Sequence, residues 1–326
     1  MRPSTMLRMV PLPRTRVRIR WGNDLAVILL CEAGEGDRQS RWRGRRPHRP
    51  VCPPLQGRQT RLILLRAPPV ITGLQQHRLV LTCEQHKSTG IMKLTIIQTG
   101  AVPEPLRGKF GPYPAMFQRM FDEAGEAFDY ETVAVYDGAP FPDATALEGI
   151  IITGSAAGVY DSHYAWMNPL REFIRAAYAA RTPMLGICFG HQIMADALGG
   201  DVRKSEKGWG LGRHTYAVKA RPTFLGTEAP DLSIACSHQD QVLVPPSEAE
   251  VFLASEFTPN AGLVYRNGAA LSLQPHPEFL DDYTLALAEL RRGKAPDAVV
   301  DTAVTSLATA SDSTETAGYL GAFLRR

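Results

Sequence analysis

Apolar residues follow two different patterns along the second part of the chain. Short runs that are apolar at nearly every position occur in "KLTIIQTG" (93–100), "EGIIITGS" (148–155) and "PMLGIC" (183–188). Between them, apolar residues recur at helical spacing in "YPAMFQRMFDEAG" (113–125) and "WMNPLREFIRAAYAAR" (166–181). Strands without polar alternation are typical of parallel sheets that are covered on both sides. The alternation therefore predicts an α/β fold, with a mostly parallel central sheet and helices on both faces.

The same reasoning extends the prediction to the end of the chain. A helix over 191–200 ends in two glycines, and a second helix is expected over 281–293. One or two more helices are expected over 296–326. Further strands are expected at 130–136, 214–218, 232–236, 250–255, 262–266 and 270–274.

The first 91 residues have a different composition from the remainder. They hold sixteen Arg and one Lys against five acidic residues, a net charge of +12, whereas the whole chain carries +3 and the remainder therefore −9. We expect residues 1–91 to be an Arg- and Pro-rich, disordered extension. Residues 92–293 are expected to form the folded domain, and residues 294–326 a helical tail.

Three interpretations of the basic segment remain open. Arginine clusters neutralise phosphates, so the segment could bind nucleic acid, but charge runs are more often solvated tails. Abundant Arg and few acids are also compatible with an organellar transit segment, although the many prolines argue against it. The third interpretation is an upstream extension from a mis-assigned start, which Met92, immediately before the first convincing strand, favours.

Cysteine usage and hydropathy indicate a compartment. The five cysteines are irregularly spaced without a Cys-x-x-Cys pair, so neither a disulfide framework nor a zinc site is predicted. No apolar run approaches the roughly 20 residues of a membrane helix, and "LAVILLC" (25–31) lacks a cleavage pattern. We therefore expect a cytoplasmic protein with no membrane partner.

One cysteine stands at the end of a predicted strand. In "PMLGICFGHQ" (183–192), Cys188 lies between Gly186 and Gly190, and a helix is predicted to follow. Small residues on both sides allow a sharp strand-to-helix turn that exposes the side chain, as in a nucleophile elbow. The helix N-terminus would favour a thiolate, and the N–H of Phe189 could hold an oxyanion. The alternative is that Cys188 is a small buried apolar residue.

A thiol nucleophile needs a base and a group that orients it. "QPHPEF" (274–279) follows a predicted strand and contains His276 and Glu278, whose side chains point the same way in extended backbone. His276 could accept the thiol proton and Glu278 could fix the imidazole tautomer. The alternative is a surface turn that happens to contain both residues.

Together these strings resemble the class I glutamine amidotransferases that use a Cys-His-Glu triad. The resemblance covers roughly residues 93–280 and is nearest to GMP-synthase-like amidotransferases without a synthase domain. It implies a flavodoxin-like domain in which Cys188, His276 and Glu278 are catalytic. It also implies that "IITGSAAG" (151–158) is the oxyanion loop, where Ser155 supplies an N–H and Gly154 permits the turn. The segment departs here from the usual Gly-Gly-Pro form.

Other positions match family residues that bind glutamine. Gln192 matches a residue that contacts the substrate, and "CSHQDQV" (236–242) resembles a segment whose backbone around Ser237 and His238 binds the amino-acid end. "GWGLG" (208–212) is expected to be a flexible loop, because it does not link a strand to a helix as a dinucleotide site requires.

The resemblance implies hydrolysis of the glutamine side-chain amide through a cysteinyl thioester, without a metal or organic cofactor. Three hypotheses remain. The chain could be an amidotransferase that feeds ammonia to a separate synthase subunit, or a free glutamine amidohydrolase. It could instead be a γ-glutamyl peptidase or hydrolase that uses the same triad. The third hypothesis is a non-catalytic binding module that uses its basic segment, although a nucleic-acid partner is disfavoured.

Overall fold

The computed structural model describes residues 16–21, 24–29, 91–226 and 230–326. The chain divides into two units, Met1–Thr89 and Gly90–Arg326. In the first unit, β1 (Arg16–Trp21) and β2 (Asp24–Leu29) pair in an antiparallel hairpin. The other positions of the predicted extension lie outside the described residues, so its disorder stays a prediction.

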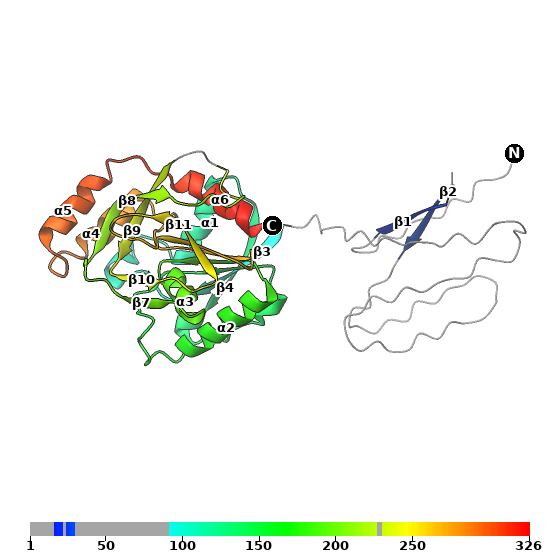
Figure 1. The fold of residues 1–326 in the computed structure, drawn as a ribbon, viewed down its shortest axis with the longest axis horizontal. Coiled ribbons are helices and arrows are strands. Elements are labelled where there is room, and N and C mark those ends of the chain that lie inside the picture. Colours follow the sequence, from blue (N-terminus) through cyan, green and yellow to red (C-terminus); the bar gives the residue numbers. More distant parts are fainter. Residues whose placement is uncertain (1–15, 22–23, 30–90, 227–229) are drawn as a thin grey trace, which may run out of the picture. The chain divides into compact units, whose positions relative to one another are not determined.

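The second unit is built on a nine-stranded sheet (Figure 1). The strand order is β4-β3-β5-β6-β13-β12-β11-β8-β9. In chain order the strands are β3 (Met92–Gln98), β4 (Phe128–Ala134), β5 (Gly149–Ile152), β6 (Met184–Ile187), β8 (Gly210–Val218), β9 (Asp231–His238), β11 (Ala249–Ala254), β12 (Gly262–Tyr265) and β13 (Ala270–Leu273).

The sheet has a parallel part and an antiparallel part. The strands β4, β3, β5, β6 and β13 are parallel, whereas β12, β11, β8 and β9 continue the sheet through antiparallel pairs. The central strands of the parallel part are the nearly all-apolar runs, and Gly149–Ile152 and Met184–Ile187 are buried at every position. The edge strand β4 is more polar and more exposed. The predicted α/β class is confirmed.

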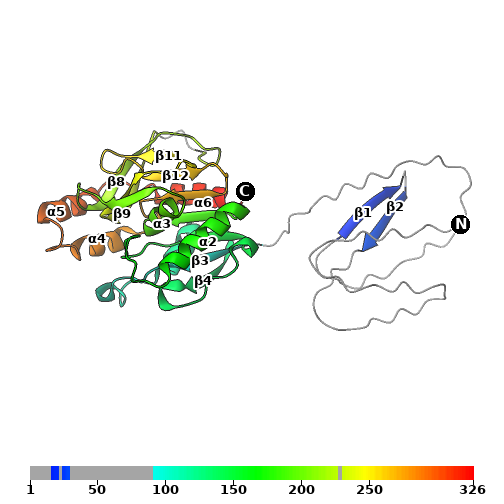
Figure 2. The same cartoon turned by 60° about the horizontal axis from the view of Figure 1, so that its bottom comes forward.

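Helices cover both faces of the parallel part (Figures 1 and 2). On one face, α1 (Tyr113–Glu123) packs with alternate residues of the strands, such as Ile96 and Ile151. On the other face, α2 (Met167–Ala180) and α3 (Phe189–Ala197) pack against Ile150 and Ile152. The side chains of neighbouring residues in β5 thus pack on opposite faces of the sheet, as strand geometry requires.

The helices of the predicted tail pack on the sheet. The first, α5 (Asp297–Ser306), follows α4 (Asp281–Glu289) and packs against β8. The last, α6 (Ser313–Leu324), lies beside α1, and its Leu320 and Leu324 join the core that contains Ile187. Both helices therefore belong to the unit Gly90–Arg326 rather than standing apart from it.

Two features of the observed structure differ from the sequence prediction. A small sheet of β7 (Asp201–Lys204) and β10 (Asp240–Val244) was not expected. The prediction of a flexible loop over 208–212 was wrong from Gly210 onward, because β8 begins there. A Cβ atom on Gly212 would lie 2.6 Å from the Cα of Ala303 in α5, so this glycine permits close strand–helix packing.

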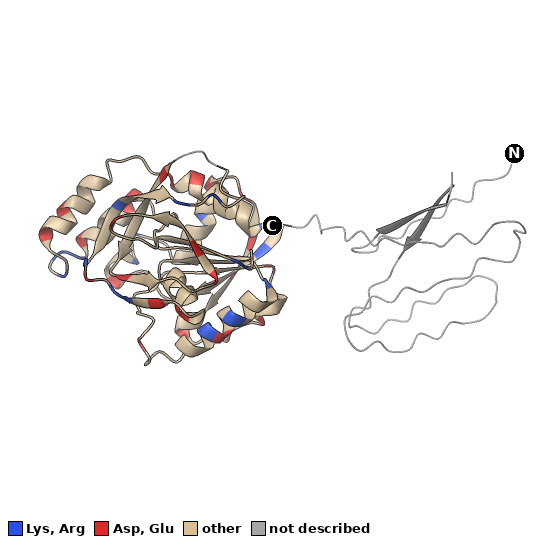
Figure 3. Ribbon diagram, viewed as in Figure 1, with Lys and Arg blue, Asp and Glu red and all other residues tan. Residues whose placement is uncertain are grey.

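The remaining features are short or peripheral. Among the described residues, no helix is long and apolar enough to cross a bilayer. Acidic and basic residues are interspersed over the ribbon of residues 91–326 (Figure 3).

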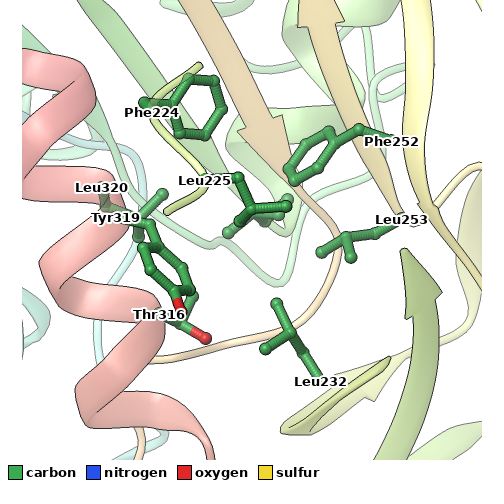
Figure 4. Close-up of a pocket in the computed structure, with 9 residues that line it drawn as sticks. Phe224, Leu225, Leu232, Phe252, Leu253, Thr316, Tyr319 and Leu320 are labelled. Carbon is green, nitrogen blue, oxygen red and sulfur yellow. The ribbon is translucent and has the colours of Figure 1, made fainter. Parts of the chain in front are cut away.

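An apolar pocket lies beside α6 (Figure 4) and is lined by Phe224, Leu225, Leu232, Phe252, Leu253, Leu273, Thr316, Tyr319 and Leu320. Short 3₁₀ helices occupy Glu104–Leu106, Val135–Asp137 and Ala144–Ala146.

Candidate active site

The predicted nucleophile occupies a strained turn. Cys188 follows β6 directly and is the N-cap residue of α3, with φ 54° and ψ −103°. Residues other than glycine rarely adopt positive φ, and such outliers gather at functional sites. The Cys188 N–H donates to the carbonyl of Leu273 at 2.8 Å, and its carbonyl accepts from the N–H of Gln192 at 3.0 Å. These bonds hold the thiol above the N-terminus of α3.

The two glycines that flank Cys188 are required by close backbone approach. A Cβ atom on Gly190 would lie 2.3 Å from the carbonyl oxygen of Ile152 in the neighbouring strand. A Cβ atom on Gly186 would lie 2.6 Å from the carbonyl carbon of Gly190. Both separations are far below van der Waals contact, so the turn can form only where both residues are glycine.

Strand pairing brings the distant histidine to the cysteine. Because β13 runs parallel to β6, with Leu273 opposite Ile187, the segments after both strands emerge at the same edge. His276 lies there, and its Nδ1 is hydrogen-bonded to Glu278 Oε1 at 2.7 Å. Its ring and the Cys188 side chain both lie against Gly154. His276 and Glu278 are only 4% and 1% exposed. The structure thus brings the three predicted triad residues together.

Opposing effects act on the imidazole of His276. Burial alone lowers its pKa, but the Glu278 carboxylate and the Cys188 side chain outweigh burial and raise the pKa to about 10. The imidazolium form is therefore favoured at neutral pH. A protonated imidazole at this position can give its proton to a leaving group.

Replacing Glu278 with glutamine is expected to lower the pKa of His276, because burial then acts without the opposing carboxylate. A raised pKa stabilises the fold below the unfolded value near 6.5, and this stability is lost as pH rises through about 10. The difference in free energy of unfolding between wild type and Glu278→Gln should therefore shrink as pH rises from about 6.5 to about 10, by at most about 1.4 kcal/mol per pH unit. Urea unfolding at several pH values measures this difference. A difference independent of pH would contradict the raised pKa of His276.

An aromatic wall, which the sequence analysis missed, supports the histidine. The ring of Phe279 stacks on the imidazole of His276, with centroids 3.9 Å apart and planes 8° from parallel. Tyr283 packs edge-on against Phe279 at 4.6 Å, and the hydroxyl groups of Tyr283 and Tyr113 lie 3.4 Å apart. The wall could have been predicted from the four-residue spacing of Phe279, just before α4, and Tyr283, in the first turn of α4.

The predicted oxyanion loop lies against the same two residues. A Cβ atom on Gly154 would be 3.1 Å from Cε1 of His276 and 3.8 Å from Cβ of Cys188. The hydroxyl of Thr99 donates to the carbonyl of Gly154 at 3.2 Å, which holds the turn in place. Ser155 follows Gly154, and its hydroxyl accepts from the N–H of Ala157 at 3.2 Å.

Phe189, the other predicted oxyanion donor, directly follows Cys188 in the chain. It is the first residue of α3, where a backbone N–H has no acceptor within the helix. Gly154 therefore lies against Cys188, and Phe189 is its neighbour in the chain. That the N–H groups of Phe189 and Ser155 hold an oxyanion stays a prediction.

The predicted glutamine-binding residues form a buried group beside α3. Gln192 Nε2 donates to the carbonyl of Asp240 at 2.8 Å and to Oε1 of Gln274 at 3.2 Å. His238 Nδ1 donates to the same Asp240 carbonyl at 3.2 Å, and burial lowers the pKa of His238 to about 3, so it is neutral. Ser237 has a buried hydroxyl without a hydrogen-bond partner among the described residues. Their contact with substrate stays a prediction.

Comparison with known families agrees with the resemblance seen in the sequence. Residues 117–282, about half of the chain, match the family described as glutamine amidotransferase class I. The chain belongs to this family. The match includes Cys188, His276 and Glu278, so the predicted triad of this class I glutamine amidotransferase lies inside the part of the chain that carries the family pattern.

Relatives of this amidotransferase include enzymes with different names. It is 33% identical over 181 residues to γ-glutamyl peptidase 4 of Arabidopsis thaliana, and the aligned segment covers 53% of this chain and 70% of the relative. It is 30% identical over 203 residues to γ-glutamyl peptidase 2 of the same plant, covering 60% and 80%. Identity with the GMP synthase of Thermus thermophilus is 29% over 166 residues, covering 47% of this chain and 31% of the synthase.

Solved structures share the fold. A glutamine amidotransferase from Thermotoga maritima superimposes with a TM-score of 0.55 at 20% identity, covering 73% of this chain and 98% of that chain. A glutamine amidotransferase from Methylobacillus flagellatus gives a TM-score of 0.55 at 19% identity, covering 72% and 95%. At these identities the likeness concerns the fold alone.

Proposed function

We propose that this protein hydrolyses the γ-amide bond of glutamine or of a γ-glutamyl compound through a thioester on Cys188. The observation that supports the proposal is that Cys188 and the hydrogen-bonded pair of His276 and Glu278 follow two adjacent parallel strands and meet beside Gly154. A nucleophile, a base within reach and a group that orients the base are the requirements of covalent acyl transfer.

In the first half-reaction, the Cys188 thiolate attacks the γ-carbonyl carbon, and the carbonyl oxygen becomes an oxyanion. The N–H groups of Phe189 and Ser155 would stabilise this charge. The intermediate collapses when the carbon–nitrogen bond breaks, and the leaving nitrogen takes the proton of the His276 imidazolium. A γ-glutamyl thioester remains, and ammonia or an amine departs.

In the second half-reaction, His276 is neutral and accepts a proton from water, whose oxygen attacks the thioester carbon. The carbon–sulfur bond then breaks, and glutamate leaves as the thiolate re-forms beside the imidazolium. Glu278 keeps the imidazole oriented throughout through its bond to Nδ1. The proposed steps use side chains and backbone N–H groups of this chain together with water.

Glutamate release tests the proposal directly. We expect the protein to release glutamate from glutamine or from γ-glutamyl peptides. An electrophilic glutamine analogue should add one glutamyl-like group to Cys188, identified by mass spectrometry of the peptide that contains it. The other described cysteine, Cys236, is fully buried, and burial raises its pKa to about 12, so it should not react. Labelling of Cys236 instead of Cys188 would refute the mechanism.

The substrate assay also separates the candidate functions. Glutamine as the better substrate would support an amidohydrolase, or an amidotransferase whose ammonia passes to a separate synthase subunit. The likeness to a GMP synthase supports that partner. γ-Glutamyl peptides as better substrates would support a peptidase, in keeping with the names of the two Arabidopsis relatives.

A further inference from the structure

The carbonyl group of Gly154, in the predicted oxyanion loop, is held by two buried threonines. Thr99 Oγ1 lies 3.2 Å from this carbonyl oxygen and 2.9 Å from that of Thr153, so the two carbonyls share its single proton. Thr153 Oγ1 donates to the Gly154 carbonyl at 3.1 Å and accepts from the backbone N–H of Thr99 at 3.1 Å. Thr99 and Thr153 are 1% and 0% exposed, so water does not compete for these hydroxyl groups.

The loop backbone also packs directly against the residues that follow β3. A Cβ atom on Gly100 would lie 3.1 Å from both Cα and Oγ of Ser155, and 3.4 Å from the carbonyl oxygen of Gly154. The loop therefore has little room to shift toward β3, and the bonds from Thr99 act on backbone that is already in contact.

The direction of the Gly154 carbonyl fixes the direction of the next N–H group. The peptide unit between Gly154 and Ser155 is trans, so the Ser155 N–H points opposite to this carbonyl. In the sheet, β5 lies between β3 and β6, and the carbonyl bonds to Thr99, which directly follows β3. The Ser155 N–H therefore points away from β3, toward the side on which Cys188 follows β6.

The two hydroxyl groups thus determine which edge of this peptide unit faces the sulfur. With its carbonyl oxygen toward the site instead, the unit would repel the negative charge that develops on the substrate. We propose that Thr99, supported by Thr153, is a positioning residue that holds the Ser155 N–H in the orientation that stabilises the oxyanion. This inference rests on the proposed function and concerns its first half-reaction.

Steady-state kinetics distinguish this positioning role from a structural one. We expect Thr99→Val, which keeps the shape of the side chain but removes the hydroxyl, to lower kcat by about 10- to 100-fold, since an oxyanion donor loses its alignment. KM should change less than about threefold, because the donor acts on the transition state. Thr99→Ser keeps the hydroxyl, so its kcat should be within about threefold of wild type.

Thr182→Val is the matched control. Thr182 is also buried, and its hydroxyl donates to the backbone carbonyl of Ala144 at 2.9 Å. It precedes β6, at the end of the strand opposite to Cys188. The variant loses an equivalent hydrogen bond, and its kcat should stay within about twofold of wild type. An equal loss of kcat in Thr99→Val and Thr182→Val would overturn the inference.

Protection of Cys188 from alkylation tests the inference without turnover. Iodoacetamide reacts with the thiolate by displacement of iodide, which forms no tetrahedral oxyanion. The γ-aldehyde analogue of glutamine instead forms a bond between the sulfur and its carbonyl carbon, and the negative charge passes to the oxygen. We expect Thr99→Val to need about 10- to 100-fold more aldehyde for half-protection, whereas its alkylation without aldehyde should change less than about twofold. Mass spectrometry of the peptide that contains Cys188 measures both.

The outcomes separate this inference from the proposed function. Wild-type kcat and protection in Thr99→Val, or an equal loss in Thr99→Ser, would overturn the inference. So would a fall in unprotected alkylation that matches the loss of kcat, because the cysteine turn itself would then have moved. Failure of the aldehyde to protect wild-type Cys188 also overturns it. If protection depends on Thr99 but wild type hydrolyses neither glutamine nor γ-glutamyl peptides, the proposed function fails and the role of Thr99 stands.

Discussion

Replacing Cys188 with alanine should reduce glutamate release at least about 1,000-fold while the protein remains folded. The thiolate forms the bond to the substrate carbonyl, and no other side chain at this position of the site can replace it. Removal of a covalent nucleophile typically costs several orders of magnitude in kcat, because the remaining groups can only orient water. Steady-state assays with glutamine and γ-glutamyl peptides measure the effect.

The matched control is Cys236→Ala. Cys236 is also a buried cysteine, in β9, but neither the predicted triad nor the oxyanion loop includes it. Its variant should keep most of the wild-type activity. Circular dichroism and urea unfolding should show both variants to be folded. Substantial activity in Cys188→Ala would eliminate the thioester mechanism.

Replacing Gly190 with alanine should destabilise the protein by about 3 kcal/mol, the upper part of the range for forced overpacking. The added Cβ atom would meet the carbonyl oxygen of Ile152 at 2.3 Å, and this atom belongs to backbone that cannot rotate away. Relief requires α3 to move away from β5, which also displaces the turn that holds Cys188. Urea unfolding measures the loss of stability. A lower rate of glutamate release would report that the turn holding Cys188 has moved.

Gly318→Ala provides the comparison for Gly190→Ala. Gly318 lies inside α6, and no atom is within 4 Å of an added Cβ there. Alanine in a helix interior is favoured over glycine by about 0.5–1 kcal/mol, so this variant should be slightly more stable than wild type. If both alanine variants had the same stability, the close approach at Gly190 would not be what constrains the turn.

The parts of the fold that local patterns encode could be predicted from the sequence. The all-apolar runs around Ile96, Ile151 and Leu185 identify buried strands, and each expected helix is present. The cysteine turn was predictable because Gly186 and Gly190 are its local requirement. Although His276 is 88 positions away, its partner Glu278 is within two residues, so the pair could be recognised together.

Features that depend on docking could not be predicted in this way. The strand at Gly210–Val218 includes Gly212 because α5 presses against it, and the sequence near Gly212 does not record that contact. Likewise, the contact of Arg291 with the ring of Trp209 depends on where the end of α4 lies, and these two residues are far apart in the chain. The aromatic wall depends on the same docking.

The place of α6 in the core has a consequence for biosynthesis. Its apolar side chains Leu320 and Leu324 share one core with Ile187 and Cys188, although α6 is translated after every strand of the large sheet. A nascent chain whose β3 to β13 have already emerged still lacks that layer. Domains generally fold as units, so the turn that carries Cys188 should reach its final packing only after α6 has emerged from the ribosome.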